Sequence, residues 1–147
     1  MIAGMGGPLM ERILKDGAKV REGFQELILQ PQSDLPHFRH FLSEIGWEIV
    51  REEMIKEDGK FYPMMKAVRN NSGKKTVYTE EEAWFGPLLL EKRHPVLKEY
   101  LLREEMIRKK ILAGLSGAES VSAKTRLAEV KEEMELIHTA LKRYESI

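Results

Sequence analysis

The apolar residues in the first half of the chain change their spacing between strand-like and helix-like several times. A short apolar run, "ELILQ" at Glu26–Gln30, predicts a buried strand, whereas apolar positions three and four apart within Leu35–Ile45 predict an amphipathic helix that Ser33 or Asp34 could cap. The expected elements are a strand at Ile2–Met5, a helix from Pro8 to Gly17, a strand within Phe24–Gln30, a helix from Leu35 to Gly46, and strands at Trp47–Ile55 and Phe61–Val68. This alternation of strands and helices predicts an α/β fold.

The turn between the last two of these strands carries a specific signal. Asp58-Gly59 stands inside "EDGK", Glu57–Lys60, between two runs rich in β-forming residues. Both central positions of a tight hairpin turn favour a positive φ, which an Asp-Gly pair tolerates. The pattern therefore predicts an antiparallel hairpin at this point of the sheet.

The second half of the chain has helical spacing throughout. Thr79 and Glu82 form a potential capping box, and a longer helix is expected from Pro95 to about Leu115. The last helix has apolar residues alternately four and three positions apart, at Ala123, Leu127, Val130, Met134, Ile137, Leu141 and Tyr144. That spacing predicts a coiled-coil seam, and two such helices joined by a short loop should pack as an antiparallel hairpin.

A polar segment separates the two halves. The sequence "NNSGKK" at Asn70–Lys75 is typical of a hinge between structural modules. We therefore expect two modules, residues 1–76 and residues 77–147.

Composition narrows the classes of partner and compartment. Lys and Arg total 24 and Asp and Glu total 24, and the two signs nearly balance on either side of Thr76. Nucleic-acid binding would therefore need local basic patches rather than a bulk positive field. No cysteine occurs, which excludes disulfides and thiolate metal sites. No apolar run approaches the length of a membrane span and no signal-peptide pattern is present, so we expect a cytoplasmic protein without a membrane segment.

Three glycines surround the end of the first expected strand. Gly4, Gly6 and Gly7 would let a ligand approach the backbone closely just before a helix N-terminus, although a tight strand-to-helix turn would need the same residues. The segment Gln30–Gln32 ends the next strand, so both segments are expected at the same edge of the sheet. Its two carboxamides could hydrogen-bond the edge of a base or cap the following helix.

The remaining polar residues give weaker signals. His37 and His40 lie three apart on one helix, a spacing that a metal could use, but no third ligand is evident and we expect no metal site. No Ser-His-Asp, Cys-His or paired-carboxylate arrangement stands out, so the sequence identifies no catalytic residue.

Several sequence blocks together resemble one enzyme family. The blocks are "IAGMGG", "LILQPQSDLPHFRHFL", "EDGKFYPMMKAVR" and "FGPLLLEKRHPVLKEYLLREE". Their order and spacing, over most of the chain, resemble the C-terminal portion of the bacterial tRNA (adenine(22)-N1)-methyltransferase family. That portion is the second half of a Rossmann-like catalytic domain followed by a helical coiled-coil domain. The resemblance implies an S-adenosylmethionine-dependent tRNA adenine-N1 methyltransferase.

The resemblance also implies positions for the elements and for the site. Ile2–Met5 is similar to strand 4 of a class I methyltransferase sheet, "ELILQ" to strand 5, and the hairpin to strands 6 and 7, which gives the neighbouring order 4-5-7-6. The implied target-base pocket is lined by Ala3, Gly4, Met5, Gly6, Gly7, Gln30, Pro31 and Gln32. The candidate tRNA-binding residues are Arg12, Lys15, Arg39, Arg69, Lys74 and Lys75.

The chain departs from the family in one respect. The family carries a further half-domain before the matching blocks, with the glycine-rich loop and the acidic residue that hold the cofactor, and no G-x-G-x-x-G occurs in these 147 residues. The resemblance therefore implies a truncated or split enzyme that is inactive alone. The strand at Ile2–Met5 would be an open sheet edge, and we expect it to pair with a second copy or with a separate N-terminal half.

Two other interpretations stay open. The chain could be a non-catalytic module derived from that family, which would bind RNA or dimerise without methylating. It could also be another nucleotide-binding α/β domain that holds adenosine with its first loop.

Overall fold

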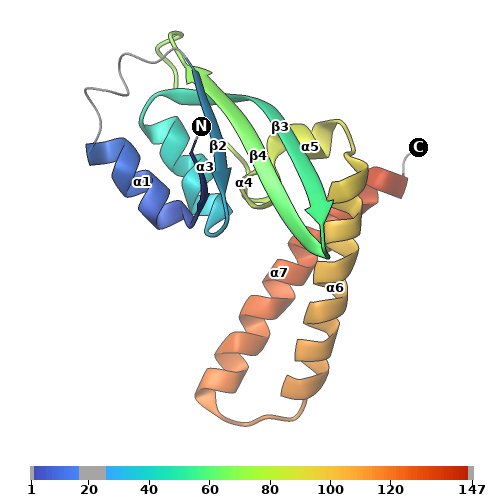
Figure 1. Cartoon of the computed structure of the whole chain (residues 1–147). Helices are drawn as coiled ribbons and strands as arrows, with labels where there is room; N and C mark the ends of the chain where they lie inside the picture. The colour runs from blue at the N-terminus through green and yellow to red at the C-terminus, as the bar shows by residue number, and fades with distance from the viewer. Residues whose placement is uncertain (1, 17–25, 146–147) are drawn as a thin grey trace. The chain divides into compact units, whose positions relative to one another are not determined.

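The computed structural model describes residues 2–16 and 26–145, and it divides the chain into two compact units, Met1–His94 and Pro95–Ile147 (Figure 1). The elements of the first unit are β1 (Ile2–Met5), α1 (Gly7–Asp16), β2 (Glu26–Pro31), α3 (Leu35–Glu44), β3 (Trp47–Glu57), β4 (Lys60–Arg69), α4 (Glu80–Phe85) and α5 (Pro87–Glu91). The second unit contains α6 (Pro95–Leu115) and α7 (Val121–Glu145). The alternation of strands and helices and the helical second half are thus confirmed.

The division between the units lies later than the expected boundary at Thr76. It falls between His94 and Pro95, because the short helices α4 and α5 pack with α3 and β3. Polar contacts described below hold these two helices to the first unit.

The four strands form one sheet in the order β1-β2-β4-β3 (Figure 1). β1 runs parallel to β2, whereas β2 pairs with β4 and β4 pairs with β3 in the antiparallel sense. The same four strands are neighbours in the order that the sequence predicts. Within the described residues β1 pairs with β2 alone, so its other side is an edge of this sheet.

The predicted hairpin between β3 and β4 is confirmed. Asp58 and Gly59 have φ values of 50° and 76°, as a tight turn between antiparallel strands requires. Further along β3 the register shifts, because Ile49 pairs with Ala67 and Arg51 pairs with Lys66. Val50 is therefore the extra residue of a bulge, after which alternate side chains of β3 again share faces with their β4 partners.

One face of the sheet carries the hydrophobic core of the first unit. The helices α1 and α3 cover this face (Figure 1), and apolar residues from the strands and helices pack together there. The buried cluster contains Met10, Leu14, Leu27, Leu29, Phe38, Phe41, Leu42, Trp47, Ile49, Met65, Ala67, Tyr78 and Ala83. Alternate residues along the strands point to the opposite face. Among them Ile28 and Ile55 are exposed, although both are large and apolar.

The helix ends follow the sequence signals only in part. The capping box is confirmed, because the Thr79 hydroxyl accepts a hydrogen bond from the Glu82 N–H and the Glu82 carboxylate accepts one from the Thr79 N–H. Asp34 occupies the N-cap of α3, but its side chain makes no capping hydrogen bond, so side-chain capping by Asp34 is wrong. The expected stop at Gly17 and strand start at Phe24 lie outside the described residues.

The second unit is a pair of long helices that pack against each other. Val130, Met134 and Ile137 are buried along α7, which confirms the predicted seam in this stretch, and Ala140 is buried beside the predicted Leu141. Ion pairs join the two helices beside the seam, as between Arg108 and Glu133. In the part of the chain that the structure describes, no helix is both long and apolar enough to cross a membrane.

Candidate functional site

The parallel pair β1–β2 brings the two candidate ligand segments together. In this pair Ala3 lies opposite Gln30 and Met5 lies opposite Pro31. Because the carboxyl ends of parallel strands share one edge, residues 3–7 and Gln30–Gln32 meet there, at the edge where open α/β sheets bind ligands. Along this segment Gln30 is half-buried, Pro31 is buried and Gln32 is exposed.

Gly7 links the two segments through its backbone. Its N–H donates to the Ser33 carbonyl oxygen (3.0 Å) and lies 3.3 Å from the Ser33 hydroxyl oxygen. A Cβ on Gly7 would collide with that same carbonyl oxygen. The close approach of the next loop therefore accounts for glycine at this position, and the space is filled by Ser33 rather than kept open for a flat ligand. This favours the turn interpretation for Gly7.

Near the starts of the two helices that follow, a histidine and a glutamate form a pair. His37 Nδ1 lies 2.7 Å from Glu11 Oε1, joining α3 to α1. The Glu11 side chain is only 11% exposed, whereas the His37 side chain is 75% exposed. No pattern in the sequence singles out Glu11, and the spacing of His37 and His40 indicated His37 only as a potential metal ligand. His40 lies elsewhere, with its ring 6.5 Å from that of Tyr78.

The structure overturns the expectation for Arg39. Its side chain is 1% exposed and paired with Glu52, with Nε and Nη2 at 3.2 and 3.0 Å from Oε2. A third nitrogen, Nη1, donates to the carbonyl oxygen of Ala83 at 2.6 Å. A buried arginine with these partners cannot reach a phosphate group, so Arg39 is not a tRNA-binding residue.

The other candidate basic residues do not gather around the carboxyl edge. Arg12 and Lys15 are exposed on α1, and the ammonium group of Lys15 lies 5.5 Å from the Phe41 ring. Arg69 lies at the opposite end of the strands, because the preceding residue, Val68, pairs with Glu26 at the start of β2. Lys74 and Lys75 follow Arg69 and are exposed, and Lys75 forms an ion pair with a glutamate at the end of α3. The candidates thus occupy two places.

Glu52 organises the end of the first unit. Its second carboxylate oxygen accepts a hydrogen bond from the Leu88 N–H at 2.9 Å, and its backbone carbonyl accepts one from Lys92 Nζ at 2.7 Å. The same Lys92 ammonium binds Glu53, with a smaller contribution from His94, and this hydrogen bonding lowers the pKa of Glu53 below its usual value. These contacts fix α4 and α5 against β3.

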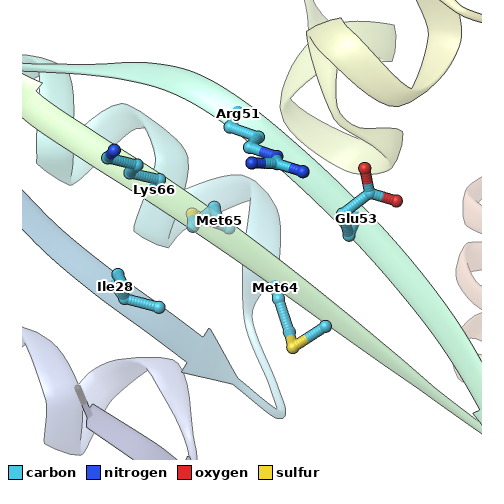
Figure 2. A pocket seen from close by; sticks show the side chains of 6 residues that line it. All are labelled: Ile28, Arg51, Glu53, Met64, Met65 and Lys66. Carbon is cyan, nitrogen blue, oxygen red and sulfur yellow. The ribbon is translucent and has the colours of Figure 1, made fainter.

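A shallow hollow of about 260 Å³ lies on the sheet face opposite α1 and α3. Figure 2 shows its lining from three neighbouring strands, and the residues are Ile28, Arg51, Glu53, Met64, Met65 and Lys66. The floor is apolar, and two cationic side chains and one carboxylate surround it. No described helix of the first unit covers this face (Figure 1).

Comparison with known proteins gives a consistent result. The family model described as tRNA (adenine(22)-N(1))-methyltransferase matches residues 1–139. The tRNA (adenine(22)-N(1))-methyltransferase of Bacillus subtilis (strain 168) is 29% identical over 139 residues, which is 92% of this chain and 58% of that protein. The chain thus spans less than two thirds of the length of this relative.

Solved structures agree on the fold. An uncharacterized protein from Listeria monocytogenes serotype 4b superposes with a TM-score of 0.88 at 29% identity, covering 95% of this chain and 61% of that one. A putative tRNA (m1A22) methyltransferase from Streptococcus pneumoniae, in complex with S-adenosyl-L-methionine, gives a TM-score of 0.79 at 24% identity, covering 95% and 59%. At that identity the second likeness concerns the fold alone.

Proposed function

Because this chain belongs to the tRNA (adenine(22)-N(1))-methyltransferase family, we propose that it takes part in S-adenosylmethionine-dependent methylation of N1 of an adenine in tRNA. The family match over residues 1–139 is the observation that carries the proposal. The sheet supports it, because the order β1-β2-β4-β3 with one parallel and two antiparallel pairs is that of strands 4-5-7-6 in class I methyltransferases. On this assignment residues 1–76 belong to the catalytic domain, α4 and α5 pack on it, and the paired long helices begin at Pro95.

In this proposal the carboxyl edge of β1 and β2 receives the target base. Residues 3–6 and Gln30–Gln32 line its pocket, and Gly7 forms the turn beside it against Ser33. The carboxamides of Gln30 and Gln32 are available to bind the edge of the purine. The base would have to leave its stacked position in the RNA to reach this edge. N1 of adenine already carries a lone pair at neutral pH, so the residues here act by orienting the ring rather than by removing a proton.

The residues of this chain do not fit the cofactor by themselves. S-adenosylmethionine supplies the methyl group when bound, but no G-x-G-x-x-G occurs in the sequence, and the bare backbone at Gly7 is occupied by Ser33. The part of the family that lies outside the match must therefore contribute the cofactor pocket. We propose that the 147 residues alone transfer no methyl group.

That further part would bind the first unit in two places. The free edge of β1 offers a row of backbone groups for a parallel strand. The hollow around Ile28 and Met64 offers an apolar floor for a helix, and large apolar residues such as Ile28 and Ile55 are exposed on this face of the sheet. The lengths of the relatives support this occupant, since the chain spans 58% of the Bacillus subtilis protein and 61% of the Listeria monocytogenes protein.

A complementation assay tests the proposal. The segment of the B. subtilis enzyme that lies outside the match would be mixed with this chain, and transfer of labelled methyl groups to unmodified tRNA would be measured. We expect transfer with both polypeptides and none with either one alone. Tight tRNA binding without transfer in any mixture would instead favour the non-catalytic RNA-binding module.

A further inference from the structure

The pair of Glu11 and His37 fixes the hydrogen-bonding character of the imidazole. A carboxylate only accepts hydrogen bonds, so the Nδ1 of a neutral His37 must carry the proton that Glu11 accepts at 2.7 Å. The other ring nitrogen, Nε2, then carries a lone pair. Because the His37 side chain is 75% exposed, this acceptor is available to a ligand.

The pair also lies beside the proposed base pocket. Gly7, the first residue of α1, contacts Ser33 just before α3. Glu11 follows Gly7 by one turn of α1, and His37 is the third residue of α3, four positions after Ser33. Side chains on a helix lean toward its N-terminus, so the imidazole leans toward the carboxyl edge of the sheet. An oriented acceptor therefore stands next to residues 3–7 and Gln30–Gln32.

We propose that His37 selects adenine by accepting a hydrogen bond from its exocyclic amino group, with Glu11 as the positioning residue that holds the imidazole in the accepting tautomer. This inference rests on the proposed function, because it uses the same base pocket. Adenine presents an amino donor beside N1, whereas guanine and hypoxanthine present a carbonyl oxygen and a protonated N1. At the position of the exocyclic group, an Nε2 lone pair accepts a hydrogen bond from the amino group of adenine and is repelled by the carbonyl oxygen of the other two bases.

The interaction would also leave the reacting nitrogen free. A hydrogen bond to the amino group engages neither the lone pair of N1 nor its path of attack. It places the buried negative charge of Glu11 behind the ring that becomes positively charged on methylation. The pair thus acts on both base choice and orientation, without any proton transfer.

Nuclear magnetic resonance of the 147-residue protein with ¹⁵N-labelled histidine tests this directly. Adenosine, inosine and N6,N6-dimethyladenosine would be titrated while the His37 ring nitrogens and the backbone amides of Gly6, Gly7 and Ser33 are followed. We expect adenosine to shift His37 Nε2 and the three amides. The other two nucleosides, which lack an amino donor, should bind about three- to tenfold more weakly, the range of a single net hydrogen bond.

Variants separate this role from a merely structural one. His37→Phe should weaken adenosine binding by the same factor and abolish the preference over inosine, while His37→Gln, which keeps an acceptor, should restore part of it. Glu11→Ala should change the proportion of the two His37 tautomers. His40→Phe, on the same helix, is the matched control and should bind adenosine like the unmodified protein. Amide spectra would verify that each variant is folded.

The outcomes distinguish the two proposals. If adenosine shifts the loop amides but His37→Phe binds it as tightly and as selectively as the unmodified protein, the selector role is wrong and the pocket stands. If adenosine shifts none of these amides, both the selector role and the base pocket are wrong.

Discussion

Arg39 and Glu52 are each 1% exposed, and their ion pair sits where α3, α4, α5 and β3 meet. Such a pair stabilises the fold only when both partners are present, because removal of one partner leaves a buried charge without compensation. Glu52→Gln keeps the shape of the side chain and removes its charge. We expect it to lower the free energy of unfolding by about 3–5 kcal/mol, measured by urea denaturation.

The double variant Arg39→Met/Glu52→Gln is the test of that reason. It removes both charges, so its loss of stability should be smaller than that of Glu52→Gln alone. Lys75→Ala, at an exposed ion pair, provides the surface reference and should change stability by less than about 1 kcal/mol. A loss below about 1 kcal/mol for Glu52→Gln would contradict the account of a buried pair.

Gly86, between α4 and α5, packs directly against the buried Arg39–Glu52 pair. It has φ of 95°, and a Cβ there would lie 2.6 and 2.9 Å from the two Glu52 carboxylate oxygens. Gly86→Ala combines backbone strain with this collision, so we expect a loss of about 2–4 kcal/mol in the free energy of unfolding.

Gly114 offers the matched comparison within the same chain. It lies inside α6, and a Cβ added there meets nothing within 4 Å. Gly114→Ala should therefore stabilise the protein by about 0.5–1 kcal/mol, since alanine favours the helix. Equal effects of the two alanine substitutions would show that the environment of Gly86 has no special importance.

At the scale of elements, the long helices hold two tyrosines with altered acidity. Burial raises the pKa of Tyr100 to about 12, and the neighbouring carboxylate of Glu104 adds to the effect. Burial also raises the pKa of Tyr144 to about 12. Between the unfolded pKa near 10 and the folded pKa near 12, the native state binds more protons than the unfolded state. The contribution of the tyrosine to stability is therefore full below this pH window and is lost as pH rises through it.

Tyr100→Phe should therefore make stability less sensitive to alkaline pH. The contribution lost by the unmodified protein across this window is at most about 2–3 kcal/mol for Tyr100, and the phenylalanine variant cannot lose it. Urea denaturation of both proteins between about pH 9 and pH 12 measures the difference. Parallel pH curves for the two proteins would exclude a raised tyrosine pKa.

The elements that the sequence predicts well are those with local signals. The Asp58-Gly59 turn, the Thr79–Glu82 capping box and the spacing along α7 each involve residues a few positions apart, and each is confirmed. Pairs distant in the chain gave no such signal. Arg39 looked like a surface cation because its partner, Glu52, is one of many acidic residues and stands on another element. The Glu11–His37 pair was missed for the same reason.

At the scale of the whole molecule, the order of the strands was predicted from the family resemblance. The Asp58-Gly59 hairpin by itself predicts only that β3 and β4 are neighbours. The sequence could not predict which glycines face a ligand. Gly7 faces Ser33, a contact that depends on how two loops meet at the sheet edge. The sequence therefore predicts where the candidate pocket lies, but the residues that line it depend on tertiary packing, which the sequence pattern does not reveal.

The open face of the sheet leads to a last prediction. Ile28 is 45% exposed on this face and borders the hollow in which Met64 and Lys66 also lie (Figure 2). If the remaining part of the family covers the hollow, a carboxylate at position 28 must lose its hydration on binding, and the neighbouring Lys66 compensates for only part of that cost. Ile28→Glu should therefore weaken the binding of the complementing B. subtilis segment by about tenfold or more, measured by isothermal titration calorimetry.

Val121→Glu is the matched control for this variant. Val121 is 82% exposed at the start of α7, outside the first unit, so the same substitution there should leave binding unchanged. Methyl transfer in the complemented mixture should follow binding, since Ile28 lies on the sheet face and not at the carboxyl edge that receives the base. Raising the concentration of the segment should thus restore the activity of the Ile28→Glu mixture. Activity that stays low at saturating segment would instead place Ile28 in the chemistry and contradict a docking role for this face.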